Sequence, residues 1–134
     1  MADAVYPSIL DSIWNGLVNI GTDTYKASIL SSAYTYSSAH TKFSDLSGVL
    51  GTGTLASVTS SGGVLDAADT VVASVSAGNM VSVVIYQYNA GTPANSRLMF
   101  YLDQGVGFNV NAAGQVTIIW PNDTNIKIFP LGGI

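Results

Sequence analysis

Residues 80–88 read Met-Val-Ser-Val-Val-Ile-Tyr-Gln-Tyr, and this stretch decides the fold class. It is dominated by β-branched and aromatic residues, which fit the pleated surface of a strand. In a strand, Val84 and Tyr86 would point to one face and Val83 and Ile85 to the other, so both faces are apolar. Such a strand lies either at the centre of a sandwich or against another chain.

Similar stretches on both sides predict further strands. They cover residues 24–31, 55–60, 64–65, 70–75, 97–102, 115–120 and 125–129, and the segments between them are rich in Gly, Asn, Pro and Ser. Residues 32–42 form a polar loop, and residues 43–48 a short turn. Short strands separated by frequent turn signals are typical of all-β domains. The sequence therefore predicts a mainly β fold, an antiparallel β-sandwich or barrel-like domain.

A helical pattern occurs only near the N-terminus. Apolar residues recur at helical spacing at Ile9, Leu10, Ile13, Trp14, Leu17 and Val18. Pro7 suits a first helical turn and Gly21 a stop, so a short amphipathic helix is predicted over residues 7–20. Its apolar side would cover a sheet face or dock onto a partner. The chain of 134 residues is expected to be one domain, with a helical arm (1–21) and a β domain (22–134).

The composition disfavours several classes of partner. Only 9% of residues are charged, 48% are hydrophobic, and four Lys and Arg against eight Asp give a net charge of -4. Nucleic acid and anionic membranes are poor partners for so few cations. No apolar run is long enough to span a bilayer, and we expect no export signal. Cysteine is absent, which excludes disulfides and thiolate metal sites.

The sequence predicts no catalytic, cofactor or metal site. His40 is the only histidine, and no GxSxG motif accompanies it. Asp66 and Asp69 lack the remaining ligands of a calcium loop. The stretch Gly48-Val-Leu-Gly51-Thr-Gly53 lacks the lysine of a phosphate-binding loop, so we expect a tight turn or bulge between strands, with positive φ at glycine. The chain is expected not to be an enzyme.

The aromatic residues allow an alternative of another class, a carbohydrate-binding β module. Tyrosine and tryptophan present apolar rings with polar tips, which suits a sugar-binding platform. The candidate residues are Tyr34, Tyr36, Tyr86, Tyr88 and Trp120. Tyrosines in strands are more often part of a core or an interface, so this alternative ranks second.

Several segments together resemble a family of small structural proteins of tailed bacteriophages. They are residues 24–35 (TYKASILSSAYT), 40–48 (HTKFSDLSG), 51–53 (GTG), 83–86, 91–92, 98–103 and 116–120. The family's members are described as head decoration, capsid-stabilising or minor structural proteins. The resemblance covers residues 22–129. It departs at Thr54, where the family has an aromatic residue, and at residues 75–79, which lack a tryptophan.

The resemblance implies a virion protein without catalysis or cofactor. Many copies would bind the major capsid protein on the capsid exterior, often at local threefold positions, after synthesis in the host cytoplasm. We also expect the chain to associate with itself into a homo-oligomer, and a trimer is one of the expected states. A head-tail connector or tail component is the alternative within the same biology.

The predicted partner interface combines three segments. It comprises Val5, Tyr6, Ile9, Leu10, Ile13 and Trp14 at the start of the chain, Tyr34, Tyr36, His40 and Phe43 in the loop, and the late residues Tyr101, Trp120 and Phe129. Aromatic residues are enriched in interface cores and charged residues are depleted there.

Overall fold

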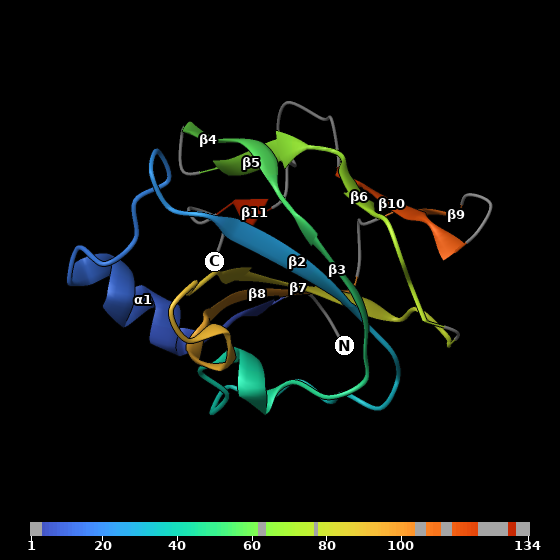
Figure 1. Cartoon of the computed structure of the whole chain (residues 1–134). Helices are drawn as coiled ribbons and strands as arrows, with labels where there is room; N and C mark the ends of the chain where they lie inside the picture. Colours follow the sequence, from blue (N-terminus) through green and yellow to red (C-terminus); the bar gives the residue numbers. More distant parts are fainter. Residues whose placement is uncertain are drawn as a thin grey trace.

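The computed structural model describes residues 4–61, 64–76, 78–103, 107–110, 114–120 and 129–130 (Figure 1). Its elements are β1 (Ala4–Val5), α1 (Pro7–Trp14), β2 (Tyr25–Leu30), η1 (Phe43–Asp45), β3 (Val49–Thr54), β4 (Ala56–Ser61), β5 (Val64–Ala68), β6 (Thr70–Val72), β7 (Ser82–Gln87), η2 (Pro93–Asn95), β8 (Arg97–Leu102), β9 (Gly107–Val110), β10 (Val116–Ile119) and β11 (Phe129–Pro130). All paired strands are antiparallel. The prediction of a mainly β fold with one short helix is confirmed.

The largest sheet has five strands in the order β1-β8-β7-β2-β3. β7 lies at its centre, and all six of its residues are buried. Ile85 lies opposite Ala27 of β2 on one side and Phe100 of β8 on the other. The two apolar faces of residues 80–88 are therefore explained by a central position within the chain itself.

The first face of this sheet packs against a smaller sheet of order β6-β10-β9. Their shared core includes Tyr25, Ala27, Ile29, Val83 and Ile85 from the large sheet and Val72, Val116, Ile118 and Trp120 from the small sheet and its end. A third sheet has the order β11-β5-β4. Figure 1 shows β6, β10 and β9 on one side of the β2–β3 pair.

Gly48 has the predicted positive φ, 65°, directly before β3, but Gly51 and Gly53 lie within β3 and lack it, so the prediction is wrong for these two glycines. Their function is close packing against β6. A Cβ atom added at Gly53 would lie 3.0 Å from the carbonyl oxygen of Val71, and one at Gly51 would lie 2.9 Å from Cγ1 of Val72. Only residues without a side chain allow these strands to approach so closely.

The second face of the large sheet is covered by the loop of residues 31–48. Its core contains Tyr6, Leu30, Tyr34, Val84, Tyr86, Leu98 and Tyr101, with Tyr36, Phe43, Leu46 and Tyr88 packed around them. The loop is joined to the start of β8 by main-chain hydrogen bonds from Phe43 N to Ser96 O and from Leu98 N to Thr41 O. We call this group of buried and half-buried aromatic residues the tyrosine face.

Helix α1 is shorter than predicted, because it ends at Trp14 rather than residue 20. Asn15 is its C-cap, and Gly16 follows with φ of 71°. This left-handed residue stops the helix, although Leu17 and Val18 continue the helical spacing of apolar residues. Ile9 is the buried anchor of α1, which packs on β8. Neither α1 nor any other helix among the described residues is long and apolar enough to cross a membrane.

Candidate functional site

The most exposed large apolar side chain among the described residues is Trp14, at 85% exposure. It occupies the last position of α1, five residues after Ile9, which is the buried residue of this helix. Leu17, in the turn that follows, is 48% exposed. Its amide donates to the carbonyl of Ser12 at 2.9 Å, which folds this turn back on the helix. We call Trp14 and Leu17 the apolar tip.

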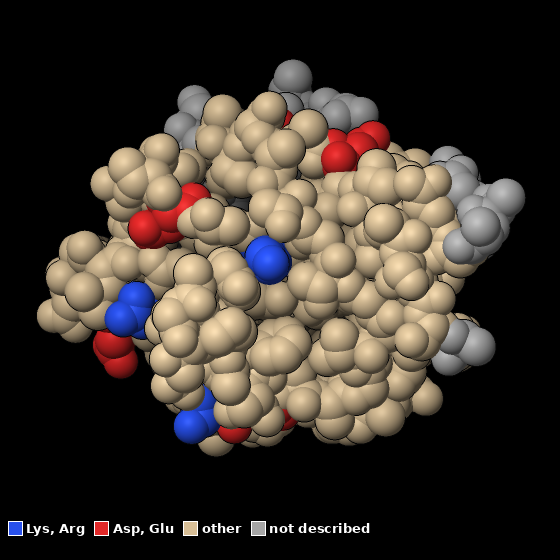
Figure 2. All heavy atoms as spheres, viewed as in Figure 1, with Lys and Arg blue, Asp and Glu red and all other residues tan. Residues whose placement is uncertain are grey.

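Charge is sparse on the face shown in Figure 2, where single basic or acidic side chains stand among uncharged surface. Other exposed apolar residues are Val49, Val71, Val81 and Ile119. Val71 and Ile119 belong to the same small sheet, in β6 and β10. Contiguous exposed apolar patches often mark protein interaction sites, whereas apolar residues scattered singly on a surface do not.

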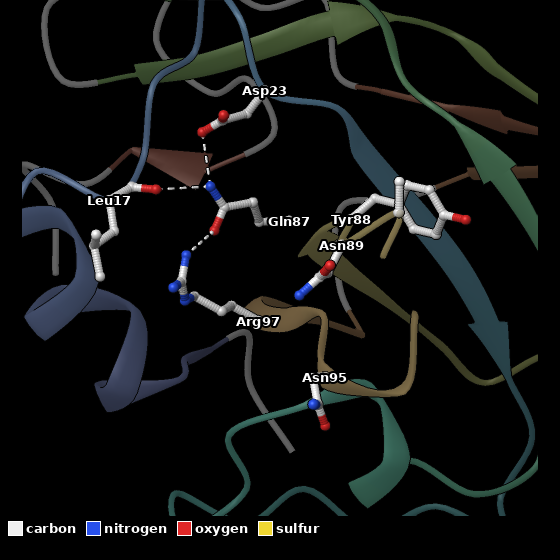
Figure 3. A pocket seen from close by; sticks show the side chains of 8 residues that line it. Leu17, Asp23, Gln87, Tyr88, Asn89, Asn95 and Arg97 are labelled. Carbon is white, nitrogen blue, oxygen red and sulfur yellow. Dashed lines mark hydrogen bonds between the residues drawn. The ribbon is translucent and has the colours of Figure 1, made fainter. Parts of the chain in front are cut away.

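A polar pocket of about 320 Å³ lies next to the apolar tip and shares Leu17 with it (Figure 3). Its other lining residues are Asp23, Gln87, Tyr88, Asn89, Ala90, Asn95 and Arg97. They come from the segment after α1, the end of β7 with the turn that follows, η2, and the start of β8. The fold therefore brings four separate segments to one site.

The side chain of Gln87 connects three other residues that line this pocket. Its Nε2 donates to the carbonyl of Leu17 at 2.8 Å and to Oδ2 of Asp23 at 2.7 Å, and its Oε1 accepts from Nη1 of Arg97 at 3.0 Å. Oδ2 of Asp23 also accepts from the amide of Asn19 at 2.7 Å. A neutral amide thus lies between the carboxylate and the guanidinium and holds both.

The tyrosine face contains a chain of hydrogen bonds that ends at His40. The hydroxyls of Tyr6 and Tyr34 lie 2.8 Å apart, and the hydroxyl of Tyr34 lies 2.7 Å from Nδ1 of His40. Burial raises the pKa of Tyr6 and of Tyr34 above the usual value. These groups stay protonated at neutral pH, and their partners are one another. They join the loop to the N-terminal segment.

Asp45 fixes the start of η1 within the same loop. Its Oδ2 accepts hydrogen bonds from the amides of Thr41 at 2.9 Å and Lys42 at 3.2 Å. The bond from Thr41 is the main reason that the pKa of this carboxyl is lowered. The aspartate therefore has a structural role at a turn.

The structure separates the predicted interface residues into two groups. Tyr6, Ile9, Tyr34, Tyr101 and Trp120 are buried within the chain, so their side chains offer no surface to a partner in this conformation and the prediction is corrected for these five. Val5, Leu10, Ile13, Tyr36, His40 and Phe43 are partly exposed, and Trp14 is fully accessible. Phe129 lies in β11, and its side chain is outside the described residues.

The predicted aromatic platform for sugars does not form. Tyr34, Tyr86 and Trp120 are buried, and Tyr36 and Tyr88 are only partly exposed. Trp120 is on the opposite face of the large sheet from the tyrosines, since it belongs to the other core cluster. Tyr34, Tyr86 and Trp120 are core residues because both faces of the sheet are covered.

The acidic residues considered for metal binding have other surroundings. Oδ1 of Asp69 accepts a hydrogen bond from the main-chain amide of Trp120 at 3.1 Å. Among the described residues, no group of three or more histidine and acidic side chains converges on a point. Comparisons with known protein families, with curated protein sequences and with solved structures find no match.

Sequence reasoning missed the polar pocket. Its signal was Gln87, a polar residue at the end of the most apolar strand of the chain. Its partners Leu17 and Asp23 are 70 and 64 positions away in sequence. No local pattern connects residues so far apart, which is why the site becomes visible only in the folded chain.

Proposed function

We propose that this protein is a structural component of a bacteriophage virion that binds the outer surface of the major capsid protein and stabilises the shell. The exposed Trp14 is the observation that supports this proposal best. Tryptophan is among the residues that contribute most to binding energy at protein interfaces. A side chain of this size, 85% exposed at the end of a packed helix, contributes little to the chain's own core.

The composition of the whole chain supports the same proposal. The chain carries only four basic and eight acidic residues, so few charges need to lose their water when its surface is covered. Interface cores are depleted in charge in the same way. Binding to a repeating lattice also requires only a modest contact from each copy, particularly if several copies associate before they bind. Self-association into a homo-oligomer is part of the proposal.

The test is co-sedimentation of the purified chain with undecorated, expanded capsids. We expect binding to saturate at a number of copies proportional to the number of capsid protein subunits. The variant Trp14→Ala is expected to bind much more weakly. Val81→Ala is the matched control, because Val81 is another exposed apolar residue and lies at the opposite end of β7 from the pocket. The control is expected to bind like the unmodified chain.

The same experiment distinguishes the alternatives. Occupancy limited to one ring per particle would favour a head-tail connector or tail component over a decoration protein. If the folded, unmodified chain does not bind to capsids, the proposal is refuted. Equal binding by the unmodified chain and a folded Trp14→Ala variant would refute the role of Trp14. Analytical ultracentrifugation of the free chain tests self-association, since a strict monomer at high concentration would remove that part.

A further inference from the structure

The polar pocket beside the apolar tip is built around a side chain that is already fully engaged. Gln87 is only 8% exposed, and both ends of its amide are used by Leu17, Asp23 and Arg97. A buried polar group needs such partners to avoid a large free-energy cost. Gln87 therefore is not available to a ligand, but it holds Asp23 and Arg97 at fixed positions on either side of itself (Figure 3).

The residues at the pocket surface keep unused hydrogen-bonding groups of both kinds. A guanidinium has five N–H donors, and in Arg97 one nitrogen is used by Gln87. The hydrogen bonds of the Asp23 carboxylate go to Oδ2, which leaves Oδ1 as an acceptor. Oδ1 of Asn89 accepts from the amides of Gly91 and Thr92, both at 3.1 Å, so its Nδ2 remains a donor.

Asn95 adds a donor and an acceptor at the rim. It lies in η2, is exposed, and its side chain makes no hydrogen bond within the described residues. Leu17 and Ala90 supply small apolar surfaces beside these polar groups. The pocket is thus a mixed surface of donors, acceptors and two aliphatic side chains.

The charges of the pocket argue against an anionic ligand. Asp23 and Arg97 balance each other, and the whole chain has a net charge of -4. A free anion would therefore meet the nearby carboxylate and an overall negative field. A neutral ligand with several hydroxyls avoids this cost, because each hydroxyl both donates and accepts.

From this arrangement we infer that the polar pocket binds a neutral saccharide, one sugar ring at a time. The volume of about 320 Å³ lies at the small end of ligand sites and suits a single ring. Ring hydroxyls would bond to Arg97, Asn89, Asn95 and Asp23, and ring C–H groups would contact Leu17 or Ala90. This site uses residues different from the aromatic platform predicted from the sequence, and it does not depend on capsid binding.

The test is an NMR titration of the full-length, ¹⁵N-labelled chain with glucose, galactose, mannose, rhamnose and N-acetylglucosamine. At least one sugar is expected to shift the amide signals of residues 17, 23, 87–90, 95 and 97 in a saturable manner. Asn95→Ala is expected to weaken that binding about fivefold, the effect of one lost hydrogen bond. Folding should be unaffected, since this side chain has no partner in the described structure.

Asn79→Ala is the matched control, because Asn79 is another exposed asparagine and lies before β7, away from the pocket. Its affinity for the sugar is expected to be unchanged. Acetate and phosphate form the anionic arm of the titration. The inference is overturned if no neutral sugar shifts these signals up to its solubility limit, if an anion binds there and sugars do not, or if both asparagine variants bind equally well.

Discussion

The two tryptophans of this chain have opposite environments, and the same substitution should affect them differently. Trp120 is 1% exposed, and its indole Nε1 donates to Oγ1 of the buried Thr70 at 3.0 Å. Trp120→Phe removes that donor and part of the ring. The unmade hydrogen bond and the cavity together are expected to lower the free energy of unfolding by about 2–4 kcal/mol. Trp14→Phe should change it by less than about 0.5 kcal/mol, because the ring is 85% exposed.

Urea denaturation followed by circular dichroism measures both changes, and equal slopes against urea would show that the unfolding transitions are comparable. Fluorescence gives a second reading, since each variant retains one tryptophan. Emission should be that of a solvent-exposed indole in Trp120→Phe and of a buried indole in Trp14→Phe. Equal losses of stability in the two variants would refute the reasoning. A stable Trp14 variant would also mean that any loss of capsid binding comes from the missing contact.

Three further predictions concern packing and the tyrosine face. Gly53→Ala is expected to lower the free energy of unfolding by about 1–3 kcal/mol, because the new Cβ would lie 3.0 Å from the main-chain oxygen of Val71. Gly91→Ala, with its nearest neighbour at 3.6 Å, is the control, and an equal drop in its melting temperature would contradict the packing argument. Tyr34→Phe is expected to lower the free energy of unfolding, measured by chemical denaturation, by about 1–3 kcal/mol, because it leaves the buried hydroxyl of Tyr6 without its partner. An unchanged denaturation midpoint would show that this hydrogen bond does not stabilise the fold. Burial raises the folded-state pKa of Tyr6 above the ordinary 10.0, so the unfolded chain gives up protons first, and stability should be full below pH 10.0 and fall as the pH rises above it. Urea midpoints that stay constant through this alkaline range would be inconsistent with a buried Tyr6.

Most of the β-strands were predictable because they carry their signal locally, whereas β1, β3 and β9 were not predicted, and β9 (Gly107–Val110) lies in a segment expected to be a connection. Residues 80–88 and 97–102 have few polar side chains, and both became buried strands of the large sheet. The predicted strand of residues 24–31 agrees with β2 within a residue at each end. Such strands depend on β-branched and aromatic residues in short runs, and turn residues mark their ends.

The failures come from interactions between distant parts of the chain. The helix prediction ran past Trp14 because Leu17 and Val18 keep the apolar spacing, while Gly16 with its positive φ ends the helix. Gly51-Thr-Gly53 resembles a turn in sequence, but β6 packs against it from 17 or more positions away. The sequence alone does not show which segments pack together.

The candidate site was only partly predictable for the same reason. Trp14 was included in the predicted interface, and it is exposed, although its contact with a partner stays a prediction. Tyr101 and Trp120 were included on equal grounds and are buried. Aromatic residues suit a core and an interface equally well, so only the arrangement of the two sheet faces separates them.

The position of β1 has a consequence for the order of events during synthesis. Ala4 and Val5 pair with Tyr101 and Phe100, so β1 leaves the ribosome well before its partner strand β8 has been made. Contacts between such distant residues form slowly, because a long loop must close first. Strand β1 therefore stays unpaired while β2 and β7 pair with each other. We expect its docking to be the last step of folding, and premature termination before β8 to leave it without a place in the sheet.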